Sequence, residues 1–318
     1  MKNRFAFIYV IMATLFFSSM EVAIKSSKGA FNPIQLNFIR FLVGGLILMP
    51  IALNDLKKAD YKLQKSDYFK FAISGFMNVV VSMSFYTSSV AYIPAYTAAI
   101  IFAGNTFFSI MLASIILKEK IDTRTFVALA ISLFGIMYII NPFNFDGSLI
   151  GVVLCLTSAV FFAFYGVLGK FFARTSDMSS IVITSFGFLF GVAELLILIC
   201  LSHIPAISDM FLSIGLEKFS MIPVFAGINS SNIHILMYIA VGVTGMGFAS
   251  YFLAMENLPV VFVSLVFFIK PVLAPIIAYI FIREVISMHN LIGLMFIVIG
   301  SCILFFTNLK KRKFNKHL

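Results

Sequence analysis

Four ionisable side chains lie inside long apolar runs of this sequence: Glu21, Arg40, Glu194 and Lys270. A charged group at the centre of a lipid bilayer costs roughly 3 kcal/mol, and it usually faces a partner or a water-filled cavity. These four residues are therefore the first candidates for binding chemistry, and each also has a structural alternative.

Lys270 stands in the stretch FFIKPVLAP, where Pro271 and Pro275 each lack a backbone N–H. Two missing donors loosen a helix and free nearby carbonyl groups, so both prolines are predicted hinge positions. A lysine there can bind a carboxylate or a phosphate, or lose its proton when it is desolvated. The alternative is a buried pair with Glu21 or Glu194 that only ties helices together.

Glu21 has two interpretations. It stands four residues before Lys25, so the two can pair along one helix face. Otherwise Glu21 faces a cavity, where it binds an amine or carries a proton. Arg40 and Glu194 are predicted to be structural, with Arg40 reaching the interface or bracing the end of the first helix. Arg40 is one possible partner of Glu194.

The other predicted binding residues are polar and mostly uncharged at neutral pH: Asn78, Tyr86, Asn105, Tyr165 and Tyr251. Asn78, Ser82 and Tyr86 follow one helix face at four-residue spacing, and Tyr251 matches Tyr86 in the repeat described below. Such a polar face can line a site, or it can hold helices together by hydrogen bonds.

The elements that carry these residues must be membrane helices. The chain of 318 residues is 61% hydrophobic and only 11% charged, with a mean hydropathy of +1.05, far from a soluble domain. Apolar runs long enough to cross a bilayer recur along the chain. They predict an all-α membrane protein with ten transmembrane helices, at 5–24, 33–53, 69–91, 95–117, 125–141, 149–170, 180–201, 233–254, 260–281 and 289–307.

The net charge of +10 is distributed unevenly between the loops. With an N-terminus in the cytoplasm, most Lys and Arg residues fall on the inner side, which predicts that both termini are cytoplasmic. The basic tail, 310–318, is then an anchor beside anionic membrane lipid, and no nucleic-acid partner is expected. Neither a metal-binding spacing of cysteines nor a nucleotide-binding loop occurs, so we expect no cofactor.

An internal repeat organises the chain. At one constant offset Pro94 pairs with Pro259, Asn105 with Lys270, and Glu119 with Glu284, and in an earlier block Lys25 pairs with Lys170. The predicted domains are a first five-helix repeat at 1–143 and a second at 144–309, with 202–232 as an insertion. Because five is an odd number, the repeats should be inverted, as in many secondary transporters.

With these motifs the sequence resembles the EamA-type transporters of the drug/metabolite transporter superfamily. The resemblance is carried by AIK at 23–25, Arg40 in NFIRFLVGGLIL, ILKEKI and FIREVI, and VGVTGMGFASYFLAMENLPV at 241–260. It implies ten helices in two repeats and transport of small metabolites, often by export. Where the family commonly has Glu-Pro in helix nine, this chain has Lys270-Pro271. Glu119 and Glu284 are expected to cap helices or hold loops.

These features favour a secondary transporter that exports small metabolites such as amino acids, with alternating access around a midplane site in the cell (plasma) membrane. Lys270 would take the anionic end of the substrate. The alternative is a lipid or lipid-linked flippase, or a subunit of one. An enzyme is disfavoured because the sequence has no HExxH motif and no paired intramembrane aspartates. A homodimer is possible.

Overall fold

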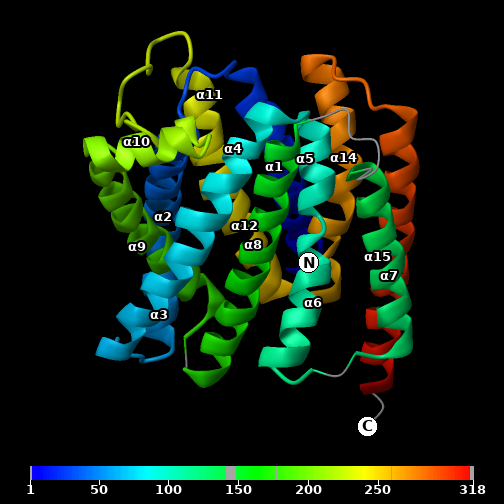
Figure 1. Ribbon diagram of the computed structural model, residues 1–318. Coiled ribbons are helices and arrows are strands. Elements are labelled where there is room, and N and C mark those ends of the chain that lie inside the picture. The colour runs from blue at the N-terminus through cyan, green and yellow to red at the C-terminus, as the bar shows by residue number, and fades with distance from the viewer. Residues whose placement is uncertain (1, 120, 141–147, 177, 259, 316–318) are drawn as a thin grey trace.

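The computed structural model describes residues 2–119, 121–140, 148–176, 178–258 and 260–315, and within these ranges the chain is helical with no strand (Figure 1). Pro259 and residues 316–318 of the basic tail lie outside the described residues. An all-helical architecture follows from the composition, since lipid offers no partners for backbone N–H and C=O groups.

The helices run in chain order as follows: α1 Lys2–Ser26, α2 Pro33–Lys58, α3 Lys65–Gly75, η1 Phe76–Met83, α4 Ser84–Tyr92, α5 Ala95–Phe102, α6 Asn105–Ile116, α7 Thr123–Ile140, α8 Leu149–Thr175, α9 Ser180–Leu201, α10 Pro205–Ser213, η2 Glu217–Phe219, α11 Ile233–Met237, η3 Tyr238–Met246, α12 Gly247–Asn257, α13 Val260–Val263, α14 Leu265–Ile282 and α15 Met288–Asn315.

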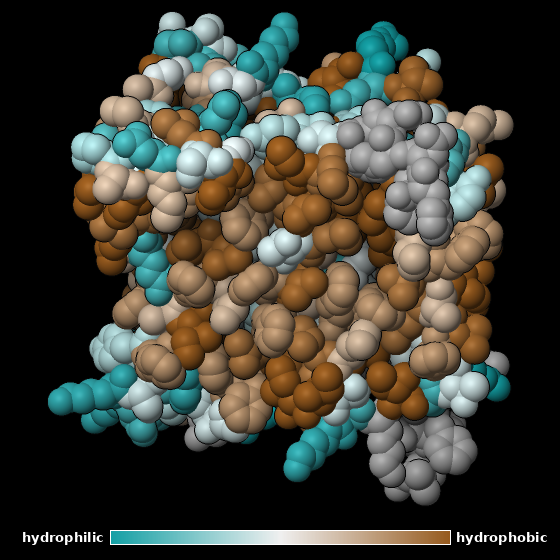
Figure 2. Space-filling view, viewed as in Figure 1, coloured by the Kyte–Doolittle hydropathy of each residue, from teal (hydrophilic) through white to brown (hydrophobic). Residues whose placement is uncertain are grey.

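Ten helical segments in the described residues are long and apolar enough to cross a membrane, which confirms the predicted number of spans. Consecutive elements form single spans in three places: α3 with η1 and α4, α5 with α6, and α11 with η3 and α12. In space-filling view a broad apolar band lies between polar ends (Figure 2). This is the surface that a protein surrounded by hydrocarbon should present.

Two helices pack against many other elements. α1 packs against α4 and α5 from the first half of the chain and against η3, α12 and α14 from the second half. α8 packs against η1, α4, α5 and α6. At the periphery α2 packs on α9, and α7 packs on α15 (Figure 1). Side chains carried by α1 are thus placed between elements from both halves of the chain.

Irregular features of the helices recur at equivalent positions of the two sequence repeats. Spans three and eight each contain a π-helical stretch, η1 and η3. Spans four and nine end alike: Lys118 and Arg283 have left-handed φ values of 55° and 56°. The next residues, Glu119 and Glu284, donate their backbone N–H to Ala113 and Ala278 respectively. These similarities support the repeat, while its inverted arrangement stays a prediction.

Span nine differs from the sequence-based expectation. α14 remains helical through Pro271 and Pro275, although both prolines were expected to loosen the helix and act as hinges. Its interruption lies earlier, at Ser264, between α13 and α14. Span four is interrupted as well, between α5 and α6, where Asn105 Nδ2 donates to the Phe102 carbonyl at 2.7 Å. That bond satisfies an acceptor at the helix break.

The insertion after α9 folds onto the start of α2. It contains α10 and η2. Gln35 Nε2 donates to the carbonyls of Val224 and Ala226 at 3.0 and 2.8 Å. Asn32 Nδ2 donates to the Lys218 carbonyl at 2.8 Å. The insertion, which includes α10, therefore covers one end of the bundle beside α11 (Figure 1).

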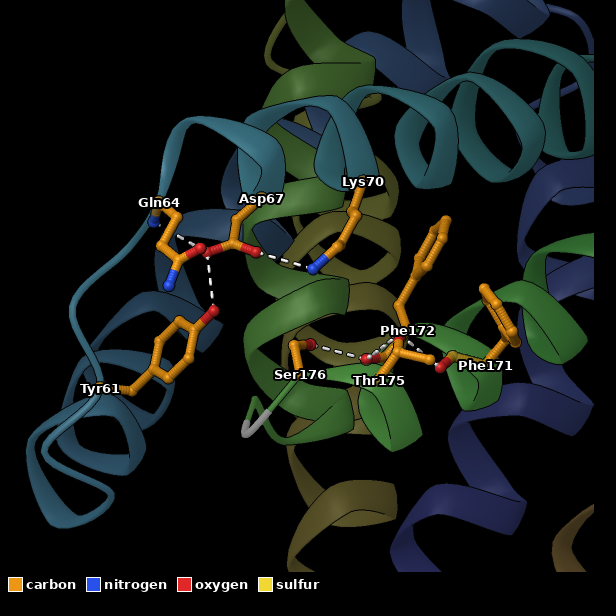
Figure 3. Close-up of polar contacts among 8 residues, drawn as sticks. All are labelled: Tyr61, Gln64, Asp67, Lys70, Phe171, Phe172, Thr175 and Ser176. Atoms are coloured by element: carbon orange, nitrogen blue, oxygen red, sulfur yellow. Dashed lines mark hydrogen bonds and ion pairs between the residues drawn. The ribbon is translucent and has the colours of Figure 1, made fainter.

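At the opposite end, side chains fix the start of α3 and the end of α8 (Figure 3). Asp67 Oδ2 accepts from the Gln64 N–H and from the Tyr61 hydroxyl, and Asp67 Oδ1 contacts Lys70 Nζ at 2.9 Å. The hydroxyls of Thr175 and Ser176 donate to backbone carbonyls of the last turn of α8. These bonds satisfy polar groups that helix ends leave free.

Candidate functional site

An ion pair is buried at the centre of the bundle. Lys270 Nζ in α14 lies 2.7 Å from Glu21 Oε1 in α1. The two residues are 7% and 0% exposed, so the pair is buried. The Tyr86 hydroxyl, from α4, donates a hydrogen bond to the same Glu21 oxygen. The carboxylate is thus held by one cation and one hydroxyl from two further helices.

Two aromatic rings stand beside the cation. Lys270 Nζ lies 5.6 Å from the centroid of the Tyr86 ring and 5.4 Å from that of Phe102. The two rings pack on each other with centroids 4.2 Å apart. Aromatic faces attract a nearby cation, most strongly where water is excluded. Glu21, Tyr86, Phe102 and Lys270 therefore form one unit, called here the ionic centre, built by α1, α4, α5 and α14.

Lys25 does not pair with Glu21, contrary to one of the two interpretations of the sequence. Its Nζ donates to the carbonyls of Val90 and Ile93, both at 3.0 Å. These carbonyls lie at the C-terminal end of α4, where a cation interacts favourably with the helix dipole. The second interpretation, in which Glu21 faces a cavity and binds an amine or carries a proton, stays a prediction.

A second polar group, on α2, adjoins the ionic centre. Arg40 is 2% exposed, and its Nε donates to Asn37 Oδ1 at 2.8 Å. Asn37 Oδ1 also accepts from the Thr87 hydroxyl at 2.9 Å. Arg40 Nη1 lies 3.2 Å from the sulfur of Met20, the residue before Glu21. Of the two expectations for Arg40, reaching the interface is wrong, because the structure buries it beside the ionic centre, where it contacts Met20 of the first helix.

The uncharged residues predicted to bind substrate, other than Tyr86, lie outside the ionic centre. Asn105 holds the break between α5 and α6, next to Phe102. Asn78 is 1% exposed, and neither of its side-chain polar atoms has a partner among the described residues. Tyr165 shares a hydrogen bond with Thr184 at 2.8 Å, linking α8 to α9. Tyr251 packs in an aromatic group with Phe17, Phe252 and Phe267.

The residues that the repeat pairs, Glu119 after span four and Glu284 after span nine, form different contacts. Glu284 Oε2 accepts from the Ala95 N–H at 2.9 Å, at the start of α5. Glu119 Oε1 contacts Lys170 Nζ and Arg174 Nη2, both at 2.7 Å. The side chains of this second group are 39–51% exposed. Hydrogen bonding from Lys170 holds the pKa of the Glu119 carboxyl below its usual range.

Sequence reasoning missed the depth of Arg40 and the role of its neighbours. The signal was present in the spacing, because Asn37, Arg40 and Gly44 recur at helical intervals and all are buried on one face of α2. Phe102 was also missed. In a chain with 39 phenylalanines, no local pattern distinguishes the one that faces a lysine.

The ten apolar helices found in the described residues, together with the buried ionic centre, define a multi-pass membrane protein with a polar interior. The sequence profile of the EamA-like transporter family matches residues 4–141 and 149–306. The chain therefore belongs to the EamA-like transporter family.

Relatives agree with this assignment. A protein of Clostridium kluyveri, described as an uncharacterized transporter, is 34% identical over 98% of this chain and 96% of its own length. A similarly described transporter of Methanothermobacter thermautotrophicus is 21% identical, over 96% of this chain and 87% of its own. The pseudopaline exporter CntI of Pseudomonas aeruginosa is 24% identical over 48% of this chain and 52% of its own.

One solved crystal structure has the same fold. It covers 94% of this chain and 96% of its own length, with a TM-score of 0.62 and 17% sequence identity. At that identity the likeness concerns the fold alone.

Proposed function

We propose that this chain is a secondary transporter that exports small carboxylate-bearing metabolites such as amino acids. Access to the ionic centre alternates between the two sides of the cell membrane, and the substrate leaves chemically unchanged. The observation that carries the proposal is the buried ion pair between Glu21 and Lys270, at the meeting point of four helices.

Stability alone is a weak reason for such a pair. Taking two charges out of water is expensive, and apolar side chains of similar volume often stabilise a fold as well or better. Binding of a carboxylate ligand would explain why the chain has this buried pair. It replaces Glu21 at Lys270, and an ammonium group, where the ligand has one, replaces Lys270 at Glu21. With a ligand that has both groups, each charge keeps a partner while the substrate is bound.

The two ends of the bundle support alternating access. At one end Lys25 and Glu284 bind backbone groups at the junction of α4 and α5. At the other end lie Glu119 and Lys170, which the repeat pairs with Glu284 and Lys25. Their side chains contact each other, not the backbone, and are exposed. We propose that the first end is closed and faces outward, and that the second faces the cytoplasm. Both termini are then cytoplasmic, as the positive loops indicate.

Export is supported by one relative, the exporter CntI, which matches about half of the chain. Contact with membrane lipid follows from the apolar band, and a homodimer remains a prediction from the sequence.

The test compares wild type with Lys270→Met and with the double variant Glu21→Gln/Lys270→Met. Purified proteins are screened by thermal shift against amino acids, organic anions, amines and nucleotides, and positive ligands are confirmed by uptake into liposomes. The double variant is the matched control because it leaves no buried carboxylate without a partner. We expect carboxylate ligands to stabilise wild type and to have no effect on the folded double variant. An unchanged response in that variant would reduce the pair to a structural role.

One observation favours the second candidate, a lipid or lipid-linked flippase. A groove of about 460 Å³ is lined by Arg124 of α7 and, from α15, by Val298, Ile299, Cys302, Ile303, Phe306 and Thr307. An apolar wall with one cation at its end suits an anionic lipid. A fluorescent-lipid assay in liposomes separates the two functions, since a flippase moves the lipid and the proposed exporter does not.

A further inference from the structure

Arg40 is a buried cation with no carboxylate partner among the described residues. Its partners are an amide oxygen, a thioether sulfur and the face of the Phe41 ring, 4.5 Å from the guanidinium carbon. Its Nη2 is buried without any hydrogen-bond partner in the described part of the chain. A charge this deep normally has an opposite charge beside it. Arg40 therefore needs an explanation that packing does not supply.

Short contact chains connect Arg40 with the ionic centre. Met20, which contacts its Nη1, is the chain neighbour of Glu21. Asn37, which accepts from its Nε, also accepts from Thr87, the chain neighbour of Tyr86. Glu21 itself uses only Oε1 for Lys270 and Tyr86, and its buried Oε2 has no partner among the described residues. One unused acceptor and one unused donor are thus carried by adjoining groups.

Formal charges in this region do not balance. Lys270 and Arg40 contribute two positive charges, and Glu21 contributes one negative charge. Buried charges interact strongly because little solvent screens them. An uncompensated positive charge in such a place favours a ligand that brings one negative charge, and it disfavours ligands of other net charge.

We propose that Arg40 is a positioning residue that sets the charge of the transported substrate. When the carboxylate of a substrate takes Lys270, Glu21 turns its free oxygen to Arg40, and each cation has one anion. The site then selects small organic anions with a net charge of −1, such as an acidic amino acid or a monocarboxylate. This inference rests on the proposed function and narrows its substrate class.

The experiment changes the charge of the site and the charge of the ligand together. Glutamate, glutamine, lysine and pyruvate are the probes, and binding to purified protein is measured by calorimetry or thermal shift. Arg40→Gln lowers the formal charge of the site from +1 to 0. We expect the ratio of glutamate to glutamine affinity to fall by about tenfold or more in this variant.

A double variant provides the control. Arg40→Gln/Glu21→Gln leaves Lys270 alone, so its formal charge returns to +1, and we expect the preference for monoanions to return. A merely structural role for Arg40 gives no such rescue. If Arg40→Gln fails to fold, Arg40→Lys takes its place, because it keeps the charge without the planar fork and should keep the preference.

The outcomes separate this inference from the proposed function. An unchanged order of ligands in Arg40→Gln, or an altered order in Arg40→Lys, overturns the role of Arg40 while leaving transport through Lys270 standing. Wild type that binds none of the carboxylates, or Lys270→Met that binds them as wild type does, overturns the proposed function and this inference with it.

Discussion

Tyr86 and Lys270 contact the same oxygen of Glu21 from two different helices. One donor is a neutral hydroxyl and the other is a cation, so they differ in what they do when the pair opens. If a substrate takes the lysine, the hydroxyl still holds the carboxylate to α4. Tyr86 thereby keeps Glu21 in place through the transport cycle that we propose.

Removing only that hydroxyl should destabilise the protein measurably. Tyr86→Phe keeps the ring against Phe102 but deletes a buried hydrogen bond to a carboxylate, a loss of about 1.5–3 kcal/mol. Thermal and denaturant unfolding in detergent measures the loss. Tyr251→Phe is the control, because its hydroxyl has no hydrogen bond among the described residues, and we expect a change within about 0.5 kcal/mol. Equal losses in the two variants would contradict the special role of Tyr86.

The contacts of Lys25 predict a second effect, on access to the interior. Cys155 is buried, and its sulfur lies 3.4 Å from the Ala98 carbonyl of α5, so its labelling by a thiol reagent reports opening near the ionic centre. In a background where the exposed Cys200 and Cys302 are serine, Lys25→Met should raise the labelling rate about tenfold, since two charged hydrogen bonds at the end of α4 are lost.

Lys170→Met is the matched control for this experiment. It removes a cation from the exposed contact with Glu119, so the closed end keeps its bonds and Cys155 should be labelled at the rate of the background protein. A slower reaction in Lys25→Met, or an equal acceleration in both variants, would argue against Lys25 as the group that closes that end.

The sequence predicted the spans well because lipid imposes a simple requirement on length and apolarity. Glu21 and Lys270 could also be recognised from single charges in apolar runs. Their pairing was the structural alternative that the sequence offered for Lys270, with Glu194 as the other partner, and the structure shows the pair with Glu21. The sequence could not choose between these partners, because the spacing of residues along one helix says nothing about the partner across the bundle, and Lys25 was a nearer candidate for Glu21. The direction of Arg40 stayed open for a related reason: a long side chain on an outer helix can reach the interface or turn inward to the first helix, and only packing on α1 and α4 decides between them.

Acidic pH should weaken the contact at the exposed end. Hydrogen bonding from Lys170 lowers the pKa of Glu119 from its ordinary value of 4.5, so the folded protein binds this proton less readily than the unfolded chain. The contribution is present above pH 4.5 and disappears as the pH falls through the folded-state pKa. For a pair this exposed it amounts to about 0.2–1 kcal/mol.

The check is a comparison of wild type with Glu119→Gln. Unfolding is followed in detergent from neutral pH down to the acid range, at low and high salt. The difference between the two proteins should shrink at low pH and at high salt, because protonation and screening both remove the attraction. A difference that grows toward acid would contradict the assigned pKa direction.

Close contact between α3 and α9 predicts the strongest structural effect of a single methyl group. A Cβ at Gly75 would lie 2.4 Å from the Gly187 oxygen and 2.5 Å from the Gly191 nitrogen, both backbone atoms that cannot rotate away. Gly75→Ala should therefore force the two helices apart and cost about 1–3 kcal/mol.

Gly166, also within a helix, is the control, because a Cβ added there would have nothing within 4 Å. Gly166→Ala should leave the stability of the protein unchanged or raise it by about 0.5–1 kcal/mol, because alanine loses less conformational entropy than glycine on folding. Thermal unfolding of the two variants beside wild type tests the packing directly, since similar shifts at both glycines would mean that α3 and α9 are not in backbone contact.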